Sequence, residues 1–127
     1  MNGRTVLVVD DDKDLLEAIT RVLRGAGYEV RGTQDGRKLG EMIRARKPDL
    51  VITDIMMPDR DGVEVITEIK KTTRGIRVLA MSGRKSLGAL DLLGMAKTLG
   101  ADATLMKPFE GDELLAAIEP LFPPRPG

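Results

Sequence analysis

Five short apolar runs alternate along the chain with five segments whose apolar residues recur every three or four positions. The first pattern is typical of buried strands and the second of amphipathic helices. We expect strands at 5–9, 28–32, 50–53, 77–81 and 103–106. We expect helices at 15–23, 39–43, 63–69, 90–99 and 114–122. This alternation predicts a doubly wound α/β fold with a parallel sheet between two helix layers, because right-handed crossovers permit little else.

The length of 127 residues fits one domain, and no internal repeat or boundary divides the sequence. We expect that domain to occupy residues 1–122. The proline-rich segment 123–127 cannot continue a helix, so we expect it to be a tail or the stub of a linker.

Composition excludes several classes of function. The chain has no cysteine and no histidine, which removes disulfides, thiolate and imidazole metal ligands, and histidine catalysis. The 20 basic and 20 acidic residues cancel, which disfavours direct binding to nucleic acids or anionic membranes. No apolar stretch suits a membrane span or a signal peptide, so we expect a cytoplasmic protein without membrane insertion.

Three adjacent carboxylates, Asp10, Asp11 and Asp12, follow the first apolar run. Like charges this close repel one another unless a cation or hydrogen-bond donors compensate them. A helix N-terminus explains part of the cluster, because carboxylates accept hydrogen bonds from its unpaired amides. We assign that role to Asp12, with Asp14 nearby, and expect Asp10 and Asp11 to face a functional site.

Polar residues also close three other predicted strands: Asp54, Ser82 and Lys107. Taken singly, the aspartate could cap a turn, the serine could be an ordinary loop residue and the lysine could be solvated. In open parallel sheets, however, ligands bind at the carboxyl ends of the strands. Together with Asp10 and Asp11 these residues suit a divalent cation and a phosphoryl group, and a carboxylate there can become an acyl phosphate.

Four motifs lie at these strand ends: Val-Val-Asp-Asp, Asp-Ile-Met-Met-Pro-Asp-Arg-Asp-Gly, Met-Ser-Gly and Lys-Pro-Phe. In this order they resemble the receiver domain of two-component response regulators, over essentially the whole chain. The resemblance implies a flavodoxin-like (βα)5 sandwich whose five-stranded parallel sheet has the order 2-1-3-4-5. This order agrees with the alternation of strands and helices.

The resemblance also implies a role for each strand-end residue. Asp54 matches the phosphoacceptor, Ser82 the switching hydroxyl and Lys107 the lysine that pairs with the phosphoryl group. The expected cofactor is Mg²⁺ or Mn²⁺. Its expected ligands are Asp10, Asp11, Asp54 and the backbone carbonyl of Met56.

Further residues match positions that modulate the family's chemistry. Met56 and Arg84 stand two positions after the acceptor and the switching hydroxyl, where side chains tune hydrolysis of the phosphoryl group. The resemblance implies a cis peptide bond before Pro108. Thr104 departs from the pattern, because the family usually carries Tyr or Phe there. We hypothesise that signalling runs instead through the loop 83–89, which has glycine at both ends of its first six residues.

The turn between the third strand and the third helix is expected at 58–62. Pro58 and Gly62 resemble residues that shape this loop in the family, since proline presets one dihedral and glycine allows a positive one.

The function that follows is a phosphorylation-activated switch in a two-component phosphorelay. The expected donor is a sensor histidine kinase or a histidine phosphotransfer protein, because this chain has no histidine. We expect the output to be contact between a downstream protein and the helix-strand-helix face formed by residues 90–122. The domain would be regulatory rather than an enzyme, with only its own phosphorylation and dephosphorylation as chemistry.

Three alternatives remain open at this point. A haloacid-dehalogenase-like phosphatase would use Asp10 as nucleophile, but its second acidic pair would have to be Asp112 and Glu113, which fall in the last predicted helix. An EF-hand loop is disfavoured because Leu15 stands where glycine is needed and Arg21 where glutamate is needed. A receiver-like binding module that is never phosphorylated would not need the complete site.

Overall fold

The computed structural model describes residues 3–55, 62–72, 75–83, 94, 96–98 and 100–122. Its strands are β1 (Thr5–Val9), β2 (Glu29–Thr33), β3 (Leu50–Asp54), β4 (Arg77–Gly83) and β5 (Ala103–Lys107). They form one five-stranded sheet of order β2-β1-β3-β4-β5, and each neighbouring pair is parallel. The doubly wound fold and the strand order 2-1-3-4-5 are therefore confirmed.

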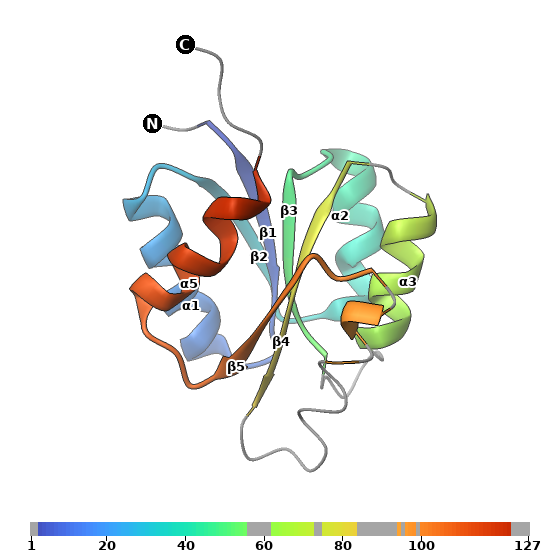
Figure 1. The fold of residues 1–127 in the computed structure, drawn as a ribbon. Coiled ribbons are helices and arrows are strands. Elements are labelled where there is room, and N and C mark those ends of the chain that lie inside the picture. Colours follow the sequence, from blue (N-terminus) through green and yellow to red (C-terminus); the bar gives the residue numbers. More distant parts are fainter. Residues whose placement is uncertain are drawn as a thin grey trace.

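Helices cover both faces of the sheet. Figure 1 shows α1 (Lys13–Gly25) and α5 (Gly111–Ile118) on one face, and α2 (Leu39–Ala45) and α3 (Gly62–Thr72) on the other. Short 3₁₀ turns, η1 (Gly36–Lys38) and η2 (Glu119–Leu121), adjoin α2 and α5. Within the predicted helix 90–99, Gly94 and residues 96–98 are helical, and the other positions lie outside the described residues.

Some boundaries differ from the sequence prediction. Strand β2 begins one residue later, and β4 continues through Gly83, so Ser82 lies inside the strand. The last helix was predicted at 114–122, whereas α5 begins three residues earlier, at Gly111, and ends four residues earlier, at Ile118. Pro120 lacks the N–H group that another helical turn would use, and the chain tightens into η2 instead.

The central strands β1 and β3 are buried on both sides, which explains why their sequences are continuous apolar runs. Alternate residues of β1 enter two separate clusters. Leu7 packs in a cluster with Ile66 of α3, whereas Val8 packs in the other cluster with Ile19 of α1 and Leu114 of α5. These two apolar layers fix the strands, and with them the positions of the polar residues at the strand ends.

The described ends of the chain meet at the amino-terminal edge of the sheet. The Arg4 guanidinium lies over the Phe122 ring, 4.5 Å from its centroid. The same ring lies 5.6 Å from the ring of Tyr28, measured between centroids. A cation over an aromatic face is attracted by the ring quadrupole, so this contact holds the start of β1 against the segment that follows η2.

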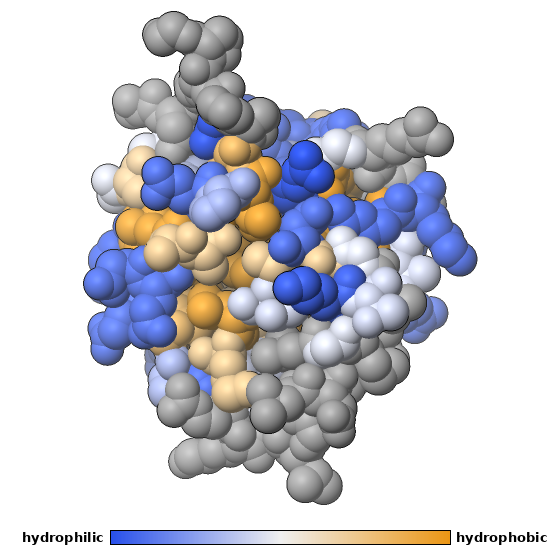
Figure 2. Space-filling model, in the orientation of Figure 1, coloured by the Kyte–Doolittle hydropathy of each residue, from blue (hydrophilic) through white to orange (hydrophobic). Residues whose placement is uncertain are grey.

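Apolar surface gathers on one face of the molecule between α5 and β5 (Figure 2). Every residue of β5 is only partly buried. The partly buried apolar residues of these two elements that pack on the α1 and α5 side of the sheet are Ala103, Leu105, Leu115 and Ala117. Separately, no helix in the described ranges is long and apolar enough to cross a membrane.

Helix α1 begins at a capping aspartate. The Asp12 carboxylate accepts hydrogen bonds from the backbone N–H groups of Asp14, at 3.0 Å, and Leu15, at 3.2 Å. These are two of the amides that a helix leaves without partners at its first turn. The assignment of Asp12 to the start of the first helix is therefore confirmed.

We predict that Asp12→Ala lowers the free energy of unfolding by about 1 kcal/mol, because the first turn loses its acceptor. The matched control is Asp12→Asn, which keeps an acceptor oxygen and removes the charge, and should leave stability nearly unchanged. Urea denaturation followed by circular dichroism measures both. Equal losses in the two variants would contradict a capping role.

Candidate functional site

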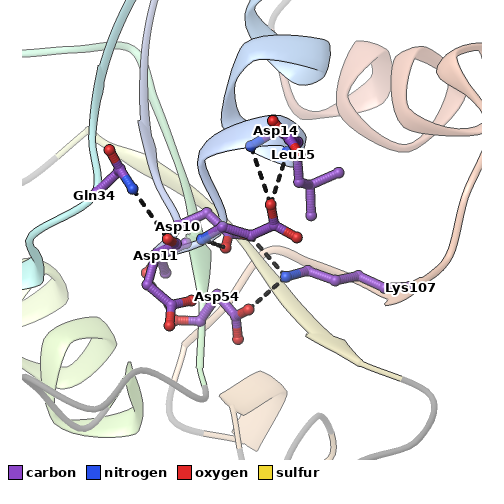
Figure 3. A network of polar contacts seen from close by, with 9 residues as sticks. Asp10, Asp11, Asp14, Leu15, Gln34, Asp54 and Lys107 are labelled. Carbon is purple, nitrogen blue, oxygen red and sulfur yellow. Dashed lines mark hydrogen bonds and ion pairs between the residues drawn. The ribbon is translucent and has the colours of Figure 1, made fainter.

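The site is built around one lysine that joins two carboxylates from other strands (Figure 3). Lys107 closes β5, and its Nζ donates to Asp10 Oδ2 at 2.7 Å and to Asp54 Oδ2 at 2.5 Å. Asp10 follows β1 directly, and Asp54 is the last residue of β3. The three residues are far apart in sequence and meet because parallel strands bring their carboxyl ends to one edge of the sheet.

Asp10 is the most enclosed member of the site. It is fully buried, and its Oδ1 accepts a hydrogen bond from the Asp12 backbone N–H at 2.9 Å. Its own backbone N–H donates to the Thr33 carbonyl of β2 at 3.2 Å. Both carboxylate oxygens of Asp10 are therefore held, one by Lys107 and one by the backbone that leads into α1.

Burial and charge act against each other in this cluster. Burial raises the pKa of Asp10 above its ordinary value, although Lys107 and the Asp12 amide partly oppose the rise. Burial alone would lower the pKa of Lys107, but hydrogen bonds and charge from Asp10 and Asp54 outweigh it and raise that pKa. Lys107 is therefore a fixed positive charge at neutral pH.

Asp11 completes an acidic cluster that could hold a metal ion. Asp10, Asp11 and Asp54 each offer one carboxylate oxygen, and these oxygens lie within 4.8 Å of one another. Asp10 and Asp54 are buried, whereas Asp11 is exposed. An all-oxygen donor set with one open side suits Mg²⁺, which takes one or two carboxylates and keeps several waters.

Ser82 lies in β4, one residue beyond Met81, the register partner of Asp54. Its side chain is fully buried, and its hydroxyl makes no hydrogen bond within the described part of the chain. A buried hydroxyl without a partner raises the free energy of the folded state. The sequence predicted a polar residue at the end of this strand, but it did not indicate that the hydroxyl would lack a hydrogen-bond partner.

The remaining predicted residues divide into two groups. Thr104 lies in β5 opposite Ala80, and the peptide bond between Lys107 and Pro108 is cis, as the resemblance implied. Met56, Pro58, Arg84 and the loop 84–89 lie outside the described residues. Of the predicted loop 58–62, Gly62 is the first residue of α3, and the other positions lie outside the described residues.

Two residues of the site, Gln34 and Thr53, were not predicted from the sequence. The Gln34 side chain, just after β2, donates from Nε2 to the Asp11 carbonyl at 3.1 Å. Thr53 is fully buried in β3, and its Oγ1 donates to the Asp54 carbonyl at 3.1 Å. The only sequence signal for Thr53 is that it is polar within an apolar run, and Gln34 has none beyond its place before the Asp35-Gly36 turn.

The described acidic residues do not support a phosphatase arrangement. The only described group of three or more potential metal ligands is Asp10, Asp11 and Asp54. Glu113, from the other candidate pair, accepts a hydrogen bond from the Glu110 backbone N–H at 2.9 Å in a capping box at the start of α5. That contact stabilises a helix terminus and supplies no carboxylate to the cluster.

Comparison with protein families gives a match over most of the chain. The family described as response regulator receiver domain matches residues 6–119. The response regulator MprA of Mycolicibacterium vanbaalenii is 39% identical over 92% of this chain and 49% of its own length. The transcriptional regulator NtrC of Azospirillum brasilense is 35% identical over 94% of this chain and 24% of its own length. The chain thus spans about half the length, or less, of these curated relatives.

Solved structures of similar sequence have the same fold. A putative response regulator from Chloroflexus aurantiacus is 32% identical, with a TM-score of 0.81 over 91% of this chain and 93% of that one. A response regulator receiver domain protein from Clostridium thermocellum is 31% identical, with a TM-score of 0.83 over 92% of both chains.

We predict that Ser82→Ala raises the free energy of unfolding by about 1 kcal/mol, because it removes a buried hydroxyl that has no partner. The matched comparison is Thr53→Val, which removes a buried hydroxyl that does have a partner and should lower stability by about 1 kcal/mol. Chemical denaturation of both variants without divalent cations measures the difference. A loss of stability in Ser82→Ala would show that the hydroxyl is satisfied.

Proposed function

The chain belongs to the response regulator receiver family, and on that premise we propose that it is a phosphorylation-activated switch with Asp54 as phosphoacceptor. As a receiver domain it is a regulatory part of a two-component system. One comparison carries the choice of Asp54 over Asp10, since both carboxylates contact Lys107: Asp10 is fully buried with both of its oxygens held, whereas Asp54 keeps 5% of its surface exposed.

The phosphoryl donor is a phosphohistidine of a sensor histidine kinase or of a histidine phosphotransfer protein. A carboxylate oxygen of Asp54 forms a bond to phosphorus while the bond from phosphorus to the imidazole nitrogen breaks. The electron pair of the broken bond stays with the imidazole, and Asp54 becomes an acyl phosphate. Lys107, already 2.5 Å from Asp54 Oδ2, neutralises and orients the phosphoryl oxygens.

Mg²⁺ or Mn²⁺ is the proposed cofactor. Asp10, Asp11 and Asp54 would hold it, together with the main-chain carbonyl of Met56, which lies outside the described residues. When bound, the cation supplies positive charge to the phosphoryl oxygens. The oxygen-only donor set and the exposed side of Asp11 support this assignment.

Ser82 is the proposed switching hydroxyl. Its buried hydroxyl is unsatisfied within the described residues, so a phosphoryl oxygen would provide the acceptor that it lacks. Thr104 has no large side chain to rotate, and the switch therefore runs through the segment after β4. In the same proposal Met56 and Arg84 tune the rate at which water removes the phosphoryl group.

The output is contact with a downstream protein, without direct binding to nucleic acid. The apolar surface between α5 and β5 supports this part, because β5 also carries the lysine of the site (Figure 2). A partner must prefer one of the two states of this face for phosphorylation to shift its binding. The domain division is part of the proposal, with a receiver at 1–122 and a tail or linker at 123–127.

Incubation with Mg²⁺ and acetyl phosphate, followed by borohydride reduction and peptide mass spectrometry, locates the phosphoryl group. We expect modification at Asp54 and none in Asp54→Asn. The matched control is Asp12→Asn, which changes the exposed aspartate that follows Asp11 and keeps the cap of α1. Asp54 should still be modified in this variant. Modification of Asp10, or modification that persists in Asp54→Asn, would overturn the proposal.

A further inference from the structure

A side-chain contact extends the pairing of β1 and β2 beyond the end of their main-chain ladder. The ladder reaches the Asp10 N–H, which donates to the Thr33 carbonyl at 3.2 Å. One residue further along both strands, Gln34 Nε2 donates to the Asp11 carbonyl at 3.1 Å (Figure 3). The amide side chain therefore takes the place of the next rung and ties the backbone of Asp11 to the end of β2.

The segment that carries Gln34 is itself held in place. Thr33 Oγ1 accepts a hydrogen bond from the Asp35 N–H at 3.1 Å, and Asp35 Oδ1 accepts one from the Arg37 N–H at 3.0 Å. Asp35 is also the N-cap of η1. Gln34 thus lies between two residues fixed by local hydrogen bonds, so the backbone from which its exposed side chain extends is held in place.

The position of the Asp11 carboxylate depends on its backbone more than the positions of the Asp10 and Asp54 carboxylates do. Asp10 is held at both oxygens, and Asp54 is held by Lys107. The Asp11 carboxylate is exposed and makes no side-chain hydrogen bond with the described residues, although its oxygen lies within 4.8 Å of the other two. The main chain of Asp11 therefore sets the position and direction of its Cα–Cβ bond, from which the carboxylate reaches the cluster.

We propose that Gln34 is a positioning residue for the cation site, raising its affinity for Mg²⁺ by fixing the backbone of Asp11. This inference rests on the proposed function, because it takes Asp11 as a metal ligand. A ligand that is already oriented loses less conformational freedom when the cation binds, and outer contacts of this kind strengthen metal sites. Gln34 acts through Asp11 and does not itself contact the cation.

Isothermal titration of the chain with Mg²⁺ tests this role directly. The variants are Gln34→Ala and Gln34→Met, and the second keeps a long side chain without a donor. We expect the dissociation constant to rise about fivefold in both, as for the loss of one neutral hydrogen bond. Asp11→Asn, which removes the ligand itself, should weaken binding more.

A matched control lies in the same turn. Arg37→Lys keeps the charge but disrupts the contacts of the guanidinium with Asp35, at 3.0 and 3.1 Å, without touching Asp11. Its dissociation constant for Mg²⁺ should equal that of the wild type. A second measurement is the rate of phosphorylation by acetyl phosphate at increasing Mg²⁺. The half-saturating Mg²⁺ concentration should rise in the Gln34 variants, with an unchanged rate at saturation.

The outcomes separate this inference from the function on which it rests. An unchanged dissociation constant in both Gln34 variants, with wild-type binding intact, overturns the positioning role and leaves the proposed function standing. A lower rate at saturating Mg²⁺ with unchanged half-saturation also overturns it, because the contact would then support the fold rather than the ligand. Absence of Mg²⁺ binding in the wild type overturns the proposed function itself.

Discussion

The ammonium of Lys107, shared between Asp10 and Asp54, is the interaction on which the site depends. Two buried carboxylates at the ends of adjacent strands would repel each other strongly without a cation. The lysine comes from β5, with β4 between it and β3. A buried ion pair of this kind offsets the desolvation of its members only if the geometry is well fixed. That geometry comes from the two apolar clusters that hold the sheet between its helix layers.

The three carboxylates of the acidic cluster have unequal surroundings. Asp10 and Asp54 are buried and share the ammonium of Lys107, whereas Asp11 is exposed and its backbone carbonyl is held by Gln34. The cluster sets three carboxyl groups against one ammonium, and Ser82 adds a buried hydroxyl without a described partner. Both features lower the stability of the folded chain as it stands. Unsatisfied charge and hydrogen-bonding capacity gathered in one place are characteristic of sites shaped for a ligand.

Much of the arrangement of the site can be predicted from the sequence, because a parallel sheet allows few positions for the ends of its strands. Once five strands alternate with helices, their carboxyl ends must share an edge, so Asp10, Asp54 and Lys107 could be grouped without coordinates. Asp12 could be separated from Asp10 because a helix start demands an acceptor. Gln34 and Thr53 could not be found this way. Gln34 contacts the end of a neighbouring strand, and strand register sets that partner, whereas Thr53 contacts the carbonyl of the next residue. One polar residue leaves no periodic signal.

The ends of helices and strands are also hard to predict from sequence, for a different reason. The sequence predicted a helix to residue 122, but Pro120 changes the local hydrogen bonding and α5 ends at Ile118. Likewise β4 continues past its apolar run to include Ser82, because pairing with β5 extends to Gly83 and Lys107. Side-chain hydrophobicity marks where a strand is buried, whereas its ends are decided by the neighbour that it pairs with.

The contact of Arg4 with Phe122 has a practical consequence for work with this chain. It brings the two described ends together at the edge of the sheet where β1 begins, and the acidic cluster lies at the edge where β1 ends. A tag, fluorophore or surface anchor joined at either end is thereby attached on the side away from Asp54. An immobilised chain would present its carboxylates outward, accessible to a phosphoryl donor in solution.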